Sequence, residues 1–182
     1  NGHQSEGEIA ILFLELAKEH YKILFEDIRD QTIEASASIM ASKALKQFIN
    51  PSLIVCSTGI NKKGDHFEGA KLVKSLSQSL GSDKLFFGGM AGDDWQLKGT
   101  FVFTNGKETD YGLVALVLNG NKIALKGMAI TGWKPVGIRR TVTKSKGNLL
   151  YEIDDKSAVD LYFKYLGKEE KLTENNFKIF EE

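Results

Sequence analysis

The chain has 182 residues, of which 42% are hydrophobic, and its 24 Lys and Arg residues balance its 24 Asp and Glu residues. This neutral charge excludes the basic surplus typical of nucleic-acid-binding proteins, and no apolar run approaches the about 20 residues that span a bilayer. A single Cys excludes an intrachain disulfide and a Cys-rich metal site. We therefore expect a soluble, cytoplasmic protein that has no nucleic-acid partner, no membrane insertion and no cofactor.

The first part of the chain predicts two strands and a helix. Ile9–Leu16 is short and almost continuously apolar, which indicates a buried strand, and Tyr21–Phe25 indicates a second one. Apolar residues then recur at helical spacing over Gln31–Phe48, and Asn50-Pro51 ends this helix.

A strand–helix–strand unit follows. Ser52–Cys56 is typical of a buried strand, and Asp65 with Glu68 forms the pattern of a capping box at the start of a helix. Gly81 ends that helix, and Leu85–Phe87 is the next apolar strand. The connection is long enough for a crossover, so the two strands should be parallel neighbours with the helix on one face of their sheet.

The second half predicts an antiparallel meander. Two dipeptides, Asn105-Gly106 and Asn119-Gly120, are strong hairpin signals. The predicted strands are Thr100–Thr104, Gly112–Leu118, Lys122–Ile130, Gly137–Val142 and Leu149–Ile153.

A last helix begins near Asp155 in this prediction. The carboxylates of Asp154 and Asp155 would cap its first amides, and Gly167 would end it. We expect one domain over residues 1–167 and a charged linker or tail over residues 168–182, in a chain that is a piece of a longer protein.

The most unusual segment joins an apolar strand to glycines and acids. Glycine inside an element weakens it, so three glycines in five positions indicate that something comes close to this backbone. The spacing lacks the Lys-Ser/Thr pair of a Walker loop and the pattern of a Rossmann turn, and adjacent acids favour a cation, an amine or a hydroxyl-rich ligand. The alternative is a strained structural turn with solvated acids. The candidate ligand-binding residues here are Gly88, Gly89, Met90, Gly92, Asp93 and Asp94.

A second loop carries Trp133 and Lys134 between two glycines. It could place an indole and an ammonium group beside a pocket, although an aromatic of this size is as well explained as a plug at the end of a sheet. Cys56, followed by His66, could form a nucleophilic pair at the end of a strand. The alternative is a buried cysteine with no catalytic role.

Five segments occur in the order expected of one protein family. Together, over Leu53–Gly167, they strongly resemble the N-terminal part of the FIST sensory domain. The segments are Phe86–Asp94, Phe101–Gly106, Gly132–Gly137, Val142–Asn148 with Tyr151–Asp154, and Ala158–Tyr162.

The resemblance implies an intracellular sensory input module that binds a small ligand, with amino acids the usual proposal, and that is not an enzyme. Similar domains occur beside histidine kinases, cyclic-dinucleotide enzymes and chemotaxis receptors, which implies a signalling domain or protein as partner. The loops at Gly88–Asp94 and at Trp133-Lys134-Pro135 are the matching site positions. The chain departs from the family by beginning inside the N-terminal region and ending before a C-terminal part. If the ligand lies between those parts, only half of its site is present.

We therefore predict a mixed α/β fold in which a parallel strand–helix–strand unit joins a mostly antiparallel sheet covered by helices. Backbone amides of the glycine loop would bind a ligand carboxylate, Asp93 or Asp94 would pair with its amino group, and Trp133 would cover its apolar part. The alternatives are a protein-interaction module without a small ligand, and a hydrolase that uses Cys56 or the paired acids.

Overall fold

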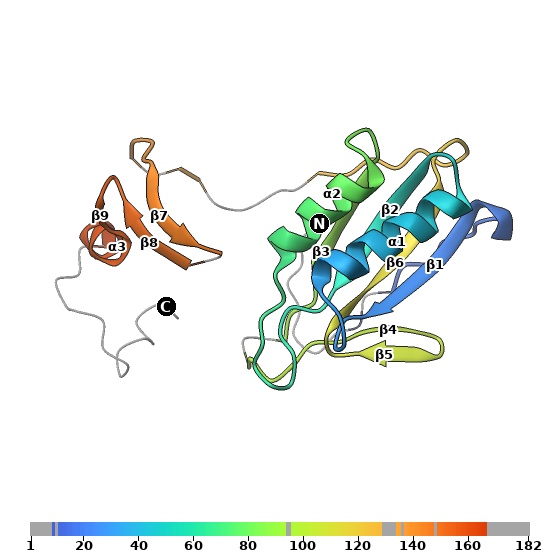
Figure 1. The fold of residues 1–182 in the computed structure, drawn as a ribbon, viewed down its shortest axis with the longest axis horizontal. Coiled ribbons are helices and arrows are strands. Elements are labelled where there is room, and N and C mark those ends of the chain that lie inside the picture. The colour runs from blue at the N-terminus through green and yellow to red at the C-terminus, as the bar shows by residue number, and fades with distance from the viewer. Residues whose placement is uncertain are drawn as a thin grey trace. The chain divides into compact units, whose positions relative to one another are not determined.

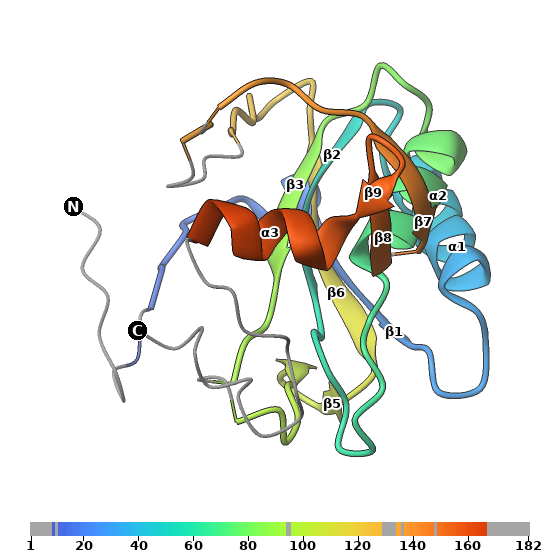
Figure 2. The same cartoon turned by 90° about the vertical axis from the view of Figure 1, so that its left-hand side faces the viewer.

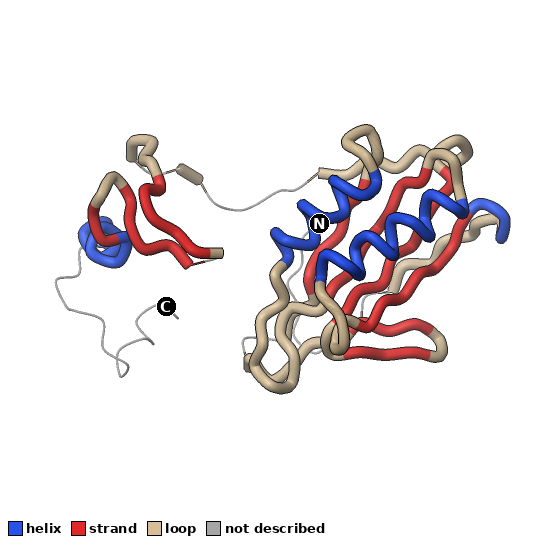
Figure 3. The backbone as a smooth tube through the Cα atoms, in the orientation of Figure 1, coloured by secondary structure: helices blue, strands red, loops and turns tan. Residues whose placement is uncertain are grey.

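The computed structural model describes residues 9, 11–93, 96–128, 134–135, 137–147 and 149–166 (Figure 1). The chain divides into two compact units, Asn1–Ala129 and Ile130–Glu182. Both units combine helices with strands, as Figure 3 shows by colour, which confirms the predicted mixed α/β class. No helix within the described ranges combines the length and the apolar character needed to cross a membrane.

A four-stranded sheet forms the centre of the first unit. Its strands lie in the order β1 (Tyr21–Asp27), β6 (Gly112–Asn119), β2 (Pro51–Ser57) and β3 (Phe86–Met90). β2 and β3 are parallel, whereas β6 is antiparallel to both of its neighbours. Two helices, α1 (Ile33–Gln47) and α2 (Gly69–Leu80), lie side by side on one face of the sheet (Figures 1 and 2). The predicted parallel strand–helix–strand unit is therefore confirmed, with α2 as its crossover helix.

Small and branched apolar side chains fill the space between the helices and the sheet. α1 begins at Thr32, whose Oγ1 accepts a hydrogen bond from the N–H of Ala35 at 3.1 Å, as expected of an N-cap threonine. The alanines of α1 let its backbone approach the sheet closely. The fully buried positions of this core include Ala37, Met40, Ala41, Ala44, Leu53, Leu113, Ala115 and Val117.

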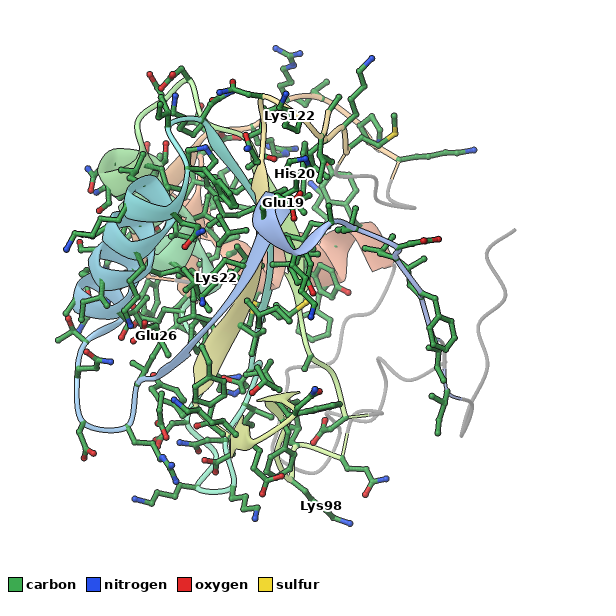
Figure 4. The ribbon with its side chains drawn as sticks, turned by 90° about the vertical axis from the view of Figure 1, so that its right-hand side faces the viewer. Glu19, His20, Lys22, Glu26, Lys98 and Lys122 are labelled. Atoms are coloured by element: carbon green, nitrogen blue, oxygen red, sulfur yellow. The ribbon has the colours of Figure 1, made fainter. Side chains whose placement is uncertain are left out.

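β1 shows which side of the sheet faces the helices. Lys22 and Glu26 lie on the α1 side of this strand (Figure 4), and the Nζ of Lys43 on α1 is 2.6 Å from the Oε1 of buried Glu26. Because successive side chains of a strand point to opposite faces, Ile23 and Phe25 point away from the helices.

The predicted strand at Ile9–Leu16 is wrong. Its described residues, 9 and 11–16, have no regular secondary structure and precede the short 3-10 helix η1 (Lys18–His20). A strand exists only where a neighbour pairs with it, and β1 pairs with β6 on one edge while no described residue pairs with its other edge. The apolar side chains of this segment are also exposed, 68% at Ile11 and 87% at Phe13, so the apolar composition predicted neither the pairing nor the burial correctly.

The hairpin predicted at Asn119-Gly120 is also wrong. The carbonyl oxygen of Asn119 accepts hydrogen bonds from the N–H groups of both Lys122 and Ile123 at 2.9 Å, which closes a tight turn. The described residues 122–128 then continue without a strand. The dipeptide correctly marked the end of β6, but the chain leaves the sheet there instead of returning along it.

The antiparallel strands of the second half fall into three sheets rather than one meander. β6 lies in the central sheet, and the predicted turn at Asn105-Gly106 joins a separate hairpin of β4 (Val102–Thr104) and β5 (Lys107–Thr109). Of the strand predicted at Gly137–Val142, only Val142 lies in a strand. The second unit holds a three-stranded sheet and a helix, namely β7 (Val142–Lys146), β8 (Leu149–Ile153), β9 (Lys156–Ser157) and α3 (Ala158–Leu166).

Asp154 and Asp155 form the turn between β8 and β9 rather than the start of a helix. Both have left-handed backbone conformations, with φ of 51° and 59°. Positive φ at both central residues is the requirement of a two-residue type I′ turn, and aspartate tolerates it better than most residues. The N-terminus of α3 uses Ser157 instead, whose Oγ accepts a hydrogen bond from the N–H of Asp160 at 3.3 Å.

Replacing Asp155 by glycine should stabilise the second unit. Glycine adopts positive φ without steric cost, and the Asp155 side chain makes no hydrogen bond to a described residue, so we expect the free energy of unfolding to rise by about 0.5–1 kcal/mol. Asp154→Gly is the matched control, because it removes the carboxylate that accepts hydrogen bonds from Thr141 N and from the guanidinium of Arg140, each at 2.9 Å. Urea titration followed by circular dichroism measures both. A stabilised Asp154→Gly, or a destabilised Asp155→Gly, would contradict this account of the turn.

Candidate functional site

The candidate site lies at the carboxyl ends of the parallel strands β2 and β3, where α2 also begins (Figure 1). In open α/β sheets, ligands gather outside this end of the strands. Two loops leave the strands here, residues 58–68 after β2 and the described residues 91–93 and 96–101 after β3. Of the predicted glycine and acid loop, residues 88–90 form the end of β3 instead, and residues 91–93 begin the second loop.

The glycines of this segment have different structural roles. A Cβ atom on Gly88 would overlap the carbonyl oxygen of Val55 in β2, so the pairing of β2 with β3 itself requires glycine there. By contrast, a Cβ atom on Gly89 or Gly92 would meet nothing within 4 Å, and neither residue has positive φ. The fold of the described residues therefore explains Gly88 and leaves Gly89 and Gly92 without a packing or conformational reason to be glycine.

The two loops are held against each other by close backbone contacts. The N–H of Ala91 donates a hydrogen bond to the carbonyl oxygen of Ser57 at 2.8 Å, and a Cβ atom on Gly59 would overlap the carbonyl oxygen of Ala91. Met90 lies against the start of α2, because a Cβ atom on Gly69 would be 2.7 Å from its Sδ. The thioether of Met90 thus lies on the helix side of β3, while its neighbour Gly89 lies on the other side.

Two buried threonines, which the sequence did not identify, fix the loop after β2. The Oγ1 of Thr100 accepts hydrogen bonds from the N–H groups of Gly59 at 2.7 Å and Ile60 at 3.1 Å, and it donates one to the carbonyl oxygen of Ile60 at 2.9 Å. The Oγ1 of Thr58 accepts one from the N–H of Gly112 at 3.1 Å. Both side chains are almost completely buried. These hydroxyl groups tie the loop after β2 to the loop after β3 and to β6.

Asp93 anchors its own loop. Its Oδ2 accepts hydrogen bonds from the N–H groups of Lys98 at 2.6 Å and Gly99 at 3.1 Å, and its carbonyl oxygen accepts one from Gln96. The bond from Gly99, followed by that from Lys98, lowers the pKa of the Asp93 carboxyl group below its usual value. The carboxylate is therefore charged at neutral pH, and one of its oxygens is used to hold the loop closed.

The remaining predicted site residues belong to the second unit or lie outside the described residues. Lys134 is exposed and belongs to the unit Ile130–Glu182, whereas Gly88–Asp93 belongs to Asn1–Ala129. Asp94 and Trp133 lie outside the described residues. Their predicted roles stay predictions.

The thiol of Cys56 lies on the face of the sheet that points away from the helices. Its side chain is exposed, in β2 between Val114 of β6 and Gly89 of β3. His66 instead lies in the loop after β2, where its backbone forms an isolated antiparallel β-bridge with Ile60. Neither side chain has a hydrogen bond to the other within the described residues. The alternative of a buried cysteine is thus wrong for Cys56, and its reactivity stays untested.

An open hollow of 330 Å³ lies along the β4–β5 hairpin, lined by Phe103, Thr104, Asn105, Gly106, Lys107 and Glu108. It is separate from the end of β3. A ligand in this hollow would therefore not contact Gly89 or Gly92, and a ligand at those glycines would bind to their exposed backbone.

Comparison with known protein families identifies the family of this chain. The family described as the FIST N domain matches residues 1–156, a range that includes both the loop after β3 and Lys134. The resemblance found in the sequence is confirmed by this match. Neither a comparison with curated proteins nor one with solved structures finds a match.

Proposed function

Because the chain belongs to the FIST N domain family, which is associated with sensory and signal-transduction roles, we propose that it is a sensory module for a small polar ligand. The ligand class is the amino acids, bound at the carboxyl end of β3. Occupancy would be relayed to an attached signalling domain or a protein partner in the cytoplasm. The observation that carries this proposal is the pair of glycines, Gly89 and Gly92, that packing leaves unexplained.

The edge of β3 supplies hydrogen-bond donors for a ligand carboxylate. The N–H of Ala91 and the carbonyl group of Leu85 bond to β2. Since alternate residues of a parallel strand bond to the same neighbour, the N–H groups of Gly88 and Met90 point to the opposite edge of β3, where no described strand pairs with it. Gly89 lies between these two amides, and a Cβ atom there would meet no described atom within 4 Å.

Charge supports a zwitterionic ligand. Asp93 is negatively charged at neutral pH, and the hydrogen bonds from the N–H groups of Lys98 and Gly99 both go to its Oδ2. It could pair with an ammonium group close to the amides that take the carboxylate. The proposal also assigns Asp94, Trp133 and Lys134 to the ligand, and for these residues it rests on the sequence alone.

We expect that at least one of the twenty standard amino acids raises the melting temperature of the full chain, and that calorimetry then gives its affinity. Gly89→Ala should weaken that affinity at least tenfold without changing the stability, because its Cβ meets no protein atom but would stand in the approach to the edge amides. Gly106→Ala is the matched control, since its Cβ also meets nothing within 4 Å and its position in the β4–β5 turn is remote from this edge.

Asp93→Asn separates charge from loop structure. The amide oxygen of asparagine can still accept the hydrogen bonds from Lys98 and Gly99, so the loop should persist while the affinity falls. If no amino acid changes the melting temperature at millimolar concentration, or if Gly89→Ala and Gly106→Ala bind equally well, the proposed site is wrong.

A protein-interaction module is the second candidate, and it is favoured by the outer edge of β3, with which no described strand pairs. Phe86–Met90 contains no charge and no proline, the devices by which edge strands are usually protected from further pairing. A partner peptide could add to it as a strand, through backbone hydrogen bonds. In that case Met90→Pro, which removes an edge N–H group, should abolish partner binding, and amino acids should leave the melting temperature unchanged.

A further inference from the structure

The face of the central sheet that points away from the helices is apolar across all four strands. The pairing registers align its side chains in two rows. We call these eight positions the open face. They are Ile23, Leu116, Ile54 and Phe87 in the first row, and Phe25, Val114, Cys56 and Gly89 in the second.

None of these eight residues is charged, yet all are at least partly exposed, and Ile23 is 51% exposed. An antiparallel sheet with one face in water normally alternates apolar and polar residues along its strands. Here β2 and β6 are apolar on both faces, as strands are when both faces are buried. Two of the eight positions are partly covered already, because Gly127 lies against the ring of Phe87 and the Nζ of Lys107 is 5.8 Å from the centroid of the Phe25 ring. The sequence of the strands indicates that the rest of the open face has a cover too.

A second exposed apolar surface belongs to the same chain. Within residues 11–16, Ile11, Leu12 and Phe13 are 68%, 79% and 87% exposed, and Glu15 is the only charged residue. Figures 2 and 4 show this segment leaving the sheet, before β1, on the side opposite α1 and α2. Two apolar surfaces of one chain are thus exposed on the same side of the sheet.

We propose that residues 11–16 fold back as a strap over the open face of the same chain. The strap joins β1 through only four residues, 17–20. Six residues reach about 20 Å when extended, whereas Tyr21 and Cys56 are separated by four residues along the strands and two strand spacings, which is about 16 Å. The strap is therefore long enough to cross the first row and reach the second.

The short connection selects the chain's own strap over that of a second copy. A tether of a few residues gives the strap an effective concentration in the millimolar range at its own sheet, which exceeds the concentration of other copies in a micromolar solution. Glu15, next to the tether, can remain at the rim of the face while the apolar residues beyond it are buried.

Cys56 reports on this closure, because it is the only cysteine of the chain and belongs to the second row. We expect its reaction with dithionitrobenzoate to be slow in the full chain and at least tenfold faster in Ile11→Asp/Leu12→Asp. Neighbouring residues of an extended chain point to opposite sides, so one of the two carboxylates lies against the sheet in either orientation. The matched control is Ile49→Asp/Val73→Asp, which changes two exposed apolar residues away from the open face and should leave the rate unchanged.

A disulfide tests the same contact without destabilising it. Leu12→Cys or Ile11→Cys should form a bond with Cys56 on mild oxidation with copper phenanthroline, and the product should run as a monomer, whereas Ile49→Cys should not react in this way. Equal labelling rates in all variants, together with no monomeric disulfide, would overturn the proposal. So would protection that grows with protein concentration and gives a disulfide dimer, since a second copy would then be the cover. Slow labelling that the strap substitutions leave unchanged would assign the cover to another part of the chain.

Discussion

Gly88→Ala is expected to lower the free energy of unfolding by about 3 kcal/mol, because its Cβ atom would overlap the carbonyl oxygen of Val55. The neighbour is backbone in a central strand, which cannot rotate away as a flexible side chain could. Relief would require β2 and β3 to separate at the register position that joins Val55 to Gly88. Urea unfolding of the full chain, followed by circular dichroism, measures the loss.

Gly89→Ala is the matched control for this prediction. It adds the same methyl group one residue later, on the opposite face of the same strand, where nothing lies within 4 Å. Its effect on stability should be within about 0.5 kcal/mol, as for most surface substitutions. Equal losses in the two variants would mean that the methyl group acts through strand propensity, and the steric account of Gly88 would then fail.

Thr100→Val is expected to cost about 3 kcal/mol. Valine has nearly the same shape but lacks the hydroxyl group, so the N–H groups of Gly59 and Ile60 lose their acceptor in a buried place. A buried donor left without a partner costs about 1–3 kcal/mol. The loop after β2 should loosen with it, so amide hydrogen exchange at Gly59 and Ile60 should accelerate well beyond the change in global stability.

Two further variants isolate the hydroxyl group as the cause. Thr100→Ser keeps the hydroxyl and should recover most of the stability, losing only the contacts of one methyl group. Thr104→Val makes the same chemical change on a partly exposed threonine of β4 whose side chain makes no hydrogen bond within the described part of the chain, and it should be nearly neutral. If Thr100→Val is as mild as Thr104→Val, Thr100 does not hold the two loops together.

The parallel unit of β2, α2 and β3 could be predicted from the sequence because its signals are local. Two short apolar runs and a helical period between them suffice, and pairing follows from the length of the connection. The partner of β6 could not be predicted in this way. Its pattern shows a strand, but nothing local indicates that this strand inserts between β1 and β2 instead of pairing with its sequence neighbours.

The glycine and acid loop could be identified from its composition, but the different structural roles of its glycines could not. Gly88, Gly89 and Gly92 look alike in the sequence, and only the position of the neighbouring strand separates the packed glycine from the two open ones. The structural roles of Thr58 and Thr100 could not be predicted, because a single threonine belongs to no hydrophobic period and to no sequence motif. Asp154 and Asp155 were assigned to a helix start, since acids favour that place as well as a turn, and their positive φ depends on the strands that they join.

The strand order also constrains how the protein is made. β6 pairs with both β1 and β2, although it follows β2 by more than fifty residues in the chain. Until the ribosome has synthesised Gly112–Asn119, neither β1 nor β2 has β6 as its neighbour. During that time α1 has no continuous sheet to pack against. Contacts between such distant segments are slow to form because a long loop must first be ordered. The nascent chain thus exposes β1 and β2 until β6 has been made, and in that interval a chaperone has more apolar surface to protect than in a fold that grows strand by strand.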